Sequence, residues 1–286
     1  MEEKYHQLVR DGFCVVEQIV APELLEWLRA TTDQICQIQD TEQQNRFRSQ
    51  GSMFTTMSDP IFIDLITLPQ PLLALRSMGF KDPTFTDGYI ISKPAHSPAL
   101  FWHYDWFAWD DPTVYLPRPQ QVFLMYYLVD TTIENGCLRV IPGSHLHHNE
   151  LHDNLDNPHS EEISTATYLE RTEFSIRPDE IDVPVKAGDL VIGDARLLHA
   201  SHANCSNQRR TVITLWFQPE FGQLPDRVKA QMVAKTQPLP DDWSESDKAR
   251  LSPLFPKYNG SAQPYGRILY KQNPKTKQNK IDERQY

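Results

Sequence analysis

The stretch FWHYDW at 101–106 places a histidine and an aspartate two residues apart, as His103 and Asp105. In an extended segment, side chains at positions i and i+2 point to the same face, so these two groups project together. One imidazole and one carboxylate can bind one side of a metal ion and leave most of its coordination positions open. Alone, a His-x-Asp pair is a weak signal, because a solvated pair in a loop has the same spacing.

A second group of polar residues begins 94 residues after Asp105. His199 follows an apolar stretch, Ser201 shares its face, and Arg210 stands eleven residues beyond His199. With His103 and Asp105, His199 would complete a facial triad, the arrangement that non-haem Fe(II) oxygenases use. An arginine at this distance can bind the distal carboxylate of 2-oxoglutarate in a bidentate salt bridge, and the Ser201 hydroxyl can assist it.

These residues resemble the phytanoyl-CoA dioxygenase-like branch of the Fe(II)/2-oxoglutarate oxygenases, from the segment LVRDGFCVV at 8–16 to about Gln218. Three marks carry the resemblance: the His-x-Asp pair, the segment NGCLRVIPGSH at 135–145, and the histidine followed by an arginine. It implies a double-stranded β-helix core of the jelly-roll, cupin-like type. It assigns iron to His103, Asp105 and His199, and 2-oxoglutarate to Arg210, Ser201 and Met125.

The reaction implied by the resemblance is hydroxylation or another oxidation of a small organic metabolite, such as a secondary metabolite, with O2, releasing succinate and CO2. Asp105 favours this over halogenation, because related halogenases have Gly or Ala at that position. Two alternatives stay open. A cupin-like metal hydrolase or isomerase uses the same three ligands but has no use for Arg210, and a non-catalytic binding module can share the fold.

The elements that must position these groups are mainly β with flanking helices. Short strands separated by turn residues are expected over 84–92, 121–130, 138–141, 181–185, 190–194, 197–201 and 211–218. Pro184 restricts the fourth of these to a sheet edge. Helices are expected over 3–10, from Pro22, and after Pro60 and Pro71.

We expect a single oxygenase domain over 1–286. It has a helical N-terminal part at about 1–80, a β core at about 84–218, and a helical or irregular C-terminal extension at about 219–286 with a helix near 225–235. The stretch 145–165 is a long excursion from the core and a candidate lid.

Alternation around the metal motif divides its aromatic residues. Trp102, Tyr104 and Trp106 fall opposite the ligands and are expected in the core. Phe107 and Trp109 share the face of the ligands and are candidates for the wall of the substrate pocket. Lys93, after a strand, is expected at the surface, with pairing to an anionic substrate or co-substrate as the alternative.

The remaining histidines do not indicate a second metal site. His145, His147, His148 and His152 crowd one loop at spacings that suit no regular coordination geometry, and the family-like turn accounts for His145. His202 lies at an odd offset from His199, so a structural role is expected.

Composition excludes several classes of protein. The 286 residues carry a formal net charge of −10 and are 40% hydrophobic, and their basic residues concentrate only in the last segment, at Lys271, Lys275, Lys277, Lys280 and Arg284. A nucleic-acid partner is therefore not expected, nor is a membrane partner, because no apolar run reaches about 18 residues. Four scattered cysteines and no secretory signal suggest a cytoplasmic protein with reduced thiols. The expected partner is a small-molecule substrate, and the oligomeric state is left open.

Overall fold

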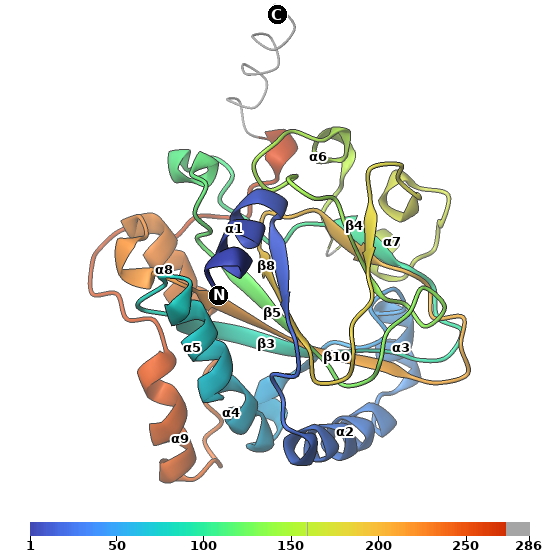
Figure 1. Cartoon of the computed structure of the whole chain (residues 1–286), viewed down its shortest axis with the longest axis horizontal. Helices are drawn as coiled ribbons and strands as arrows, with labels where there is room; N and C mark the ends of the chain where they lie inside the picture. The colour runs from blue at the N-terminus through green and yellow to red at the C-terminus, as the bar shows by residue number, and fades with distance from the viewer. Residues whose placement is uncertain (159, 273–286) are drawn as a thin grey trace, which may run out of the picture.

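Figure 1 shows the computed structural model, which describes residues 1–158 and 160–272. Its helices are α1 Glu2–Asp11, α2 Pro22–Gln37, α3 Thr41–Arg46, α4 Ile61–Ile66, α5 Pro69–Ser77, α6 Glu150–Asn154, α7 Glu161–Ser164, α8 Asp226–Lys235 and α9 Glu245–Leu251. Its strands are β1 Phe13–Val16, β2 Phe54–Thr55, β3 Thr84–Lys93, β4 Leu100–His103, β5 Val122–Tyr127, β6 Leu138–Val140, β7 Ile181–Val183, β8 Leu190–Asp194, β9 His199–Ser201 and β10 Arg210–Gln218.

The strands form two antiparallel sheets. The larger sheet has the order β1-β8-β5-β10-β3-β2, and the smaller sheet has the order β4-β9-β6-β7. Together they make a sandwich with flanking helices, which confirms the expected mainly-β class. The strand β7 lies at the edge of its sheet and ends at Val183, so Pro184 removes no hydrogen bond from a ladder.

The two faces of the large sheet differ because its strands alternate in side-chain direction. On β10, Ile213 and Leu215 face outward, where they pack with apolar residues of the helices, such as Leu28, Phe62 and Leu75. The helices α2, α4, α5 and α9 gather along this side of the molecule in Figure 1. This outer core fixes the large sheet from behind and leaves its inner face to the smaller sheet.

The inner face of the large sheet carries the polar residues. Along β10 they are Arg210 and Thr214, in alternation with the outward-facing apolar residues. Phe123 and Tyr127 of β5 belong to the inner apolar cluster, with Val212 of β10. The side chains of the inner face, Arg210 and Thr214 among them, are therefore directed between the two sheets.

The N-terminal part follows the expected pattern. The helix α1 ends at Gly12, whose φ of 87° is left-handed, and an added Cβ there would lie 2.7 Å from Nδ1 of His145. Pro22 is the first residue of α2, and α4 begins directly after Pro60. Helices α3 and α9 were not expected. All residues of α3 are polar and α9 has only seven residues, so neither shows the apolar periodicity that predicts a helix.

The excursion at 145–165 contains α6 and α7, and the C-terminal extension contains α8 and α9. Within the described residues, no helix has the length and apolar character needed to span a membrane. Of the basic residues near the C-terminus, Lys271 forms an ion pair with Asp156 at 2.6 Å. Lys275, Lys277, Lys280 and Arg284 lie outside the described residues.

Candidate active site

His103 and His199 lie on neighbouring strands of the smaller sheet. His103 is the last residue of β4 and is paired in register with His199, the first residue of β9. Their ring centroids are 4.1 Å apart, with an angle of 47° between the planes. Strand pairing therefore brings together two imidazoles that are separated by almost a hundred residues of sequence.

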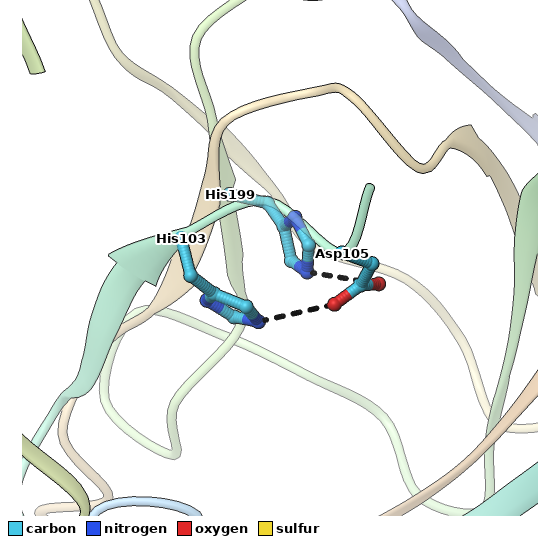
Figure 2. A group of neighbouring side chains, drawn as sticks. All are labelled: His103, Asp105 and His199. Carbon is cyan, nitrogen blue, oxygen red and sulfur yellow. Dashed lines mark ion pairs between the residues drawn. The ribbon is translucent and has the colours of Figure 1, made fainter. Parts of the chain in front are cut away.

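Asp105 lies beyond the end of β4, and backbone hydrogen bonds hold it in place. The N–H groups of Asp105 and Trp106 both donate to the carbonyl oxygen of Ala195, each at 2.8 Å. Ala195 belongs to the turn between β8 and β9, so the same turn that leads to His199 also fixes Asp105. Figure 2 shows the three side chains pointing toward one another.

The turn before His199 is anchored by a buried ion pair. Arg196 and Asp194 are 1% and 2% exposed, and their closest charged atoms are 2.6 Å apart. The Arg196 guanidinium also donates to the backbone carbonyl of Leu116 at 2.8 Å. Breaking a buried pair of this kind is strongly destabilising, so the pair helps to hold the turn that carries Ala195.

Distances within the triad suit a single metal ion. His103 Nε2 is 3.7 Å from Asp105 Oδ1, and His199 Nε2 is 3.9 Å from Asp105 Oδ2. One donor atom from each residue lies within 4.8 Å of the others. Two imidazole nitrogens and one carboxylate oxygen are the donor set of non-haem Fe(II) sites, and they leave coordination positions for other ligands.

Hydrogen bonds at the rear of each imidazole select the nitrogen that faces the centre. His103 Nδ1 lies 3.0 Å from the carbonyl oxygen of Phe101, and His199 Nδ1 lies 3.0 Å from that of Leu197. A carbonyl can only accept, so each Nδ1 carries the proton and each Nε2 keeps its lone pair. Metal-ligating histidines are oriented in this way.

Asp105 is held as a carboxylate. Trp216 on the inner face of β10 donates its indole N–H to Asp105 Oδ2 at 2.8 Å. Burial by itself raises the pKa of Asp105. The positive charge that His199 and His103 carry when they are protonated, together with the hydrogen bond from Trp216, outweighs burial, so the pKa lies below its ordinary value. The carboxylate is therefore ready to bind a cation.

Arg210, at the start of β10, is a buried cation that lacks an anionic partner. Its side chain is 3% exposed, and Nη2 donates to Ser201 Oγ at 3.3 Å. Its Nε is buried without a hydrogen-bond partner, and within residues 1–158 and 160–272 no carboxylate forms an ion pair with it. Burial lowers the pKa of Arg210. A carboxylate of 2-oxoglutarate would satisfy both the charge and the orphaned N–H.

Two further features support a polar ligand at this point. Thr214 lies on the same face of β10 as Arg210, and its hydroxyl is buried without a partner. Lys93 pairs in register with Arg210 and is fully buried, so the expectation of a surface lysine is wrong. Its ammonium donates to the carbonyls of Ser49 and Pro98, and burial beside Arg210 places its pKa well below the ordinary value.

Arg209 immediately precedes β10, and its side chain has different partners from that of Arg210. Its guanidinium donates to the backbone carbonyl of Ser92 at 3.1 Å, which places it on the side away from Ser201. Met125, which the resemblance placed beside 2-oxoglutarate, lies on the inner face of β5 and pairs in register with Thr214. Its sulfur accepts from the Tyr127 hydroxyl at 3.8 Å.

Phe107 and Trp109 lie in an aromatic cluster with Trp102, Tyr104 and Trp106. Both are 2% exposed, and neither is among the residues that line the cavity beside the triad. The alternation that placed them on the face of the ligands does not apply, because β4 ends at His103. The structure therefore places them in the core.

A cavity of about 240 Å³ opens beside His103 and Asp105. Its wall includes polar residues that sequence reasoning missed, namely Gln50, Asp87, Gln121, Lys235 and Arg267. The only signal for Asp87 was its place in the alternation of β3, where it pairs in register with Trp216. No local pattern marked the others.

His145, His148, His152 and His202 have partners outside the triad. His145 Nε2 bonds to the carbonyl of Val9 at 2.9 Å, and His152 completes a capping box on α6. His202 Nε2 lies at hydrogen-bond distance, 2.6 Å, from Asp182 Oδ1, in a group that also includes the buried Cys137. Among the described residues, the loop histidines form no cluster of metal-binding type.

Comparisons with known proteins agree with this geometry. The profile of the phytanoyl-CoA dioxygenase (PhyH) family matches residues 8–212, well over half of the chain. A phytanoyl-CoA dioxygenase domain-containing protein 1 homologue of Dictyostelium discoideum is 30% identical over 122 residues, which cover 43% of this chain and 36% of the relative. Phytanoyl-CoA dioxygenase 1 of Oryza sativa subsp. japonica is 30% identical over 162 residues, or 55% and 52% of the two chains. The matched part thus spans about half or less of these relatives.

Solved structures show the same fold. The epimerase SnoN from nogalamycin biosynthesis, in complex with Fe3+, alpha ketoglutarate and nogalamycin RO, superimposes with a TM-score of 0.56 at 19% identity, covering 76% of this chain and 82% of that chain. This likeness confirms the double-stranded β-helix architecture. Members of the matched family use Fe(II) and 2-oxoglutarate, as the motifs had indicated. The chain belongs to the phytanoyl-CoA dioxygenase family.

Proposed function

We propose that this chain is a dioxygenase that binds Fe(II) through His103, Asp105 and His199 and oxidises a small organic molecule with 2-oxoglutarate as co-substrate. The observation that carries the proposal is the meeting of the three donor atoms within 4.8 Å at the wall of a cavity. Two imidazoles with fixed tautomers and one carboxylate fit Fe(II) in donor type and number.

Arg210 supports the co-substrate assignment. Its buried guanidinium, with Ser201 beside it, would bind the distal carboxylate of 2-oxoglutarate through charge-assisted hydrogen bonds. A metal hydrolase or isomerase on the same fold has no chemical need for a buried cation at this position. This observation favours the oxygenase over that alternative.

When bound, iron and 2-oxoglutarate supply the oxidising chemistry, in which O2 is consumed and succinate and CO2 are released. The protein contributes position and the exclusion of water. Trp216 holds Asp105, the backbone carbonyls of Phe101 and Leu197 orient the two imidazoles, and the apolar part of the cavity wall receives the substrate. Asp105 favours hydroxylation or another oxidation over halogenation, since halide would need the position that Asp105 takes.

Anaerobic titration of Fe(II) and 2-oxoglutarate tests the proposal. The wild type should develop a visible metal-to-ligand charge-transfer band, and His199→Ala should lose it. His202→Ala is the matched control, because His202 lies three residues further on and pairs with Asp182 instead of the triad. A hydrolase or isomerase would show no band in the wild type.

A non-catalytic binding module on this fold can form the same coloured complex, so a second measurement is needed. Aerobic incubation with a panel of small metabolites, scored by succinate release above the uncoupled background, separates the two. Stimulation by at least one compound identifies the enzyme and its substrate class. A coloured complex that no compound stimulates would favour the binding module.

A further inference from the structure

The C-terminal extension contributes to the candidate active site. The family profile ends at residue 212, yet Lys235 and Arg267 line the same cavity as His103 and Asp105. Both are cations, and they come from a part of the chain whose role the sequence left unassigned. Some residues lie outside the part of the chain that a family shares and still reach the active site. Such residues are candidates for selecting the substrate.

Arg267 is positioned by hydrogen bonds that attach its segment to the chain just after the metal motif. The N–H of Ile268 donates to the carbonyl of Phe107 at 2.9 Å. The hydroxyl of Tyr265 donates to the buried Asp111 carboxylate at 2.8 Å. With the residues on both sides attached in this way, Arg267 is held at the cavity as a fixed part of its wall.

The Arg267 guanidinium lacks a partner for its charge. Its Nε is buried and has no hydrogen-bond partner, and no ion pair of Arg267 is found in the described part of the chain. Burial lowers the pKa of Arg267, against the opposing effect of Asp105. Asp105 is the carboxylate that binds the metal in our proposal, so its charge is already used. Arg267 therefore brings to the cavity wall a positive charge that no other carboxylate of the described residues pairs with.

Lys235 is in a different position. It is the last residue of α8, and its ammonium lies 5.1 Å from the centre of the Phe107 ring. Asp87, also in the cavity wall, is near enough for the charge of Lys235 to favour its ionised form. These two opposite charges offset each other, which leaves the charge of Arg267 in excess.

The rest of the wall is largely apolar. Its apolar members include Met53, Ile91, Leu100 and Phe101. A ligand that matches this cavity has an apolar body of small size and one anionic group. A purely apolar ligand would bury the Arg267 donor without a partner, which is unfavourable.

We propose that Arg267 binds an anionic oxygen group, a carboxylate or a phosphate, on the organic substrate. This rests on the proposed function, because it names the substrate class of the same site. The site differs from that of Arg210, which is not in the wall of this cavity and lies beside Ser201. A buried arginine, Arg210, and a half-buried one, Arg267, thus serve two different anions, one on the co-substrate and one on the substrate.

The test uses the full chain loaded anaerobically with Fe(II) and 2-oxoglutarate, so that Arg210 is already occupied and turnover is prevented. Calorimetric titration at pH 7.5 compares 3-phenylpropionate, 2-phenylethyl phosphate and the neutral 3-phenylpropionamide. We expect the wild type to bind at least one anion roughly tenfold or more tightly than the amide, as for a charge-assisted contact. Which anion binds more tightly distinguishes a carboxylate substrate from a phosphate substrate.

Variants assign the preference to one residue. Arg267→Gln should abolish the preference for the anion and leave amide binding unchanged, and Arg267→Lys should retain part of it. Arg250→Gln is the matched control, since Arg250 is an exposed arginine of the same extension paired with Asp64. Equal binding of anions and amide by the wild type, or no binding of any probe, overturns the proposal. So does an Arg267→Gln protein whose only defect is weaker 2-oxoglutarate binding.

The charge-transfer band keeps this inference separate from the proposed function. If the wild type shows no charge-transfer band, the proposal of an oxygenase is wrong. If that protein still binds the anion through Arg267, the anion site stands. If the wild type shows the band but its preference for the anion does not depend on Arg267, the proposal of an oxygenase stands and the proposal of the anion site is wrong.

Discussion

The indole N–H of Trp216 and the carboxylate of Asp105 form a 2.8 Å hydrogen bond between the large sheet and the metal motif. It engages Oδ2, while Oδ1 lies toward His103. Partners of this kind orient a metal ligand, and their removal typically lowers metal affinity about 10- to 100-fold. Trp216→Phe should therefore bind Fe(II) more weakly by about that factor, measured by competition with a chelator.

The control for this change is Trp243→Phe. Trp243 is 7% exposed and packs in the outer core on the other side of the large sheet, so it tests loss of an indole without touching Asp105. Both variants should lose some stability in urea. If Trp216→Phe kept full iron affinity, the hydrogen bond would have no part in holding the ligand.

Arg210 and Arg209 provide an internal comparison for co-substrate binding. The Arg210 side chain is buried beside Ser201, and Arg209 bonds to the backbone at Ser92. Loss of a charge-assisted contact costs about 1.5–3 kcal/mol, or roughly ten- to hundred-fold in affinity. Arg210→Ala should weaken 2-oxoglutarate binding by that factor under anaerobic Fe(II), and Arg209→Ala should leave it nearly unchanged.

Reversed behaviour of the two arginine variants would show that the anion is bound on the other side of β10. Unchanged affinity in both would place the co-substrate elsewhere. In either case Ser201, whose hydroxyl contacts Arg210, would lose its assigned role as well.

Much of the site was accessible from sequence because its residues obey local rules. The spacing of His103 and Asp105 predicted a common direction, which the structure keeps although β4 ends at His103 and the Ala195 carbonyl holds Asp105. Arg209 and Arg210 are neighbours where β10 begins, and alternation predicted their different directions. The turn at Gly12 and the edge position of β7 likewise follow from the conformational limits of glycine and proline.

The rest depends on contacts between distant parts of the chain. Trp216 stands in an apolar strand and is indistinguishable by pattern from a core residue, because its partner is 111 residues away. Lys93 is buried only because the carbonyls of Ser49 and Pro98 surround its ammonium. Arg267 reaches the cavity through the pairing of Ile268 with Phe107. Contacts between distant parts of the chain leave no periodic pattern in the sequence, so they cannot be predicted from it.

Gly193 on β8 leaves room for a ring that covers His199. An added Cβ would lie 2.0 Å from Phe123 Cζ, and the Phe123 ring lies 4.8 Å from that of His199. Overpacking of this kind typically costs about 1–3 kcal/mol. Gly193→Ala should lower the free energy of unfolding by that amount and reduce Fe(II) affinity, because Phe123 has to move against its neighbours.

Gly222→Ala is the control, since the nearest atom to its added Cβ would be Asp82 Oδ2 at 3.7 Å, an ordinary contact. Urea unfolding and iron titration of both variants give the comparison. A Gly193→Ala protein as stable as wild type would mean that the Phe123 ring can move without strain.

Asp87 should make stability depend on pH. Burial raises the pKa of Asp87 to about 6, although Lys235 opposes the shift. Between about pH 4 and 6 the folded protein therefore retains a proton that the unfolded chain has lost. The contribution of Asp87 to stability is fully present below about pH 4 and is lost as the pH rises through about 6. Relative to Asp87→Asn, the wild type should lose at most about 3 kcal/mol of unfolding free energy between pH 4 and pH 7. Urea titrations of the metal-free proteins measure this difference, with the exposed Asp242→Asn as control. A difference between wild type and Asp87→Asn that stays constant over this range would show that the cavity leaves Asp87 fully hydrated.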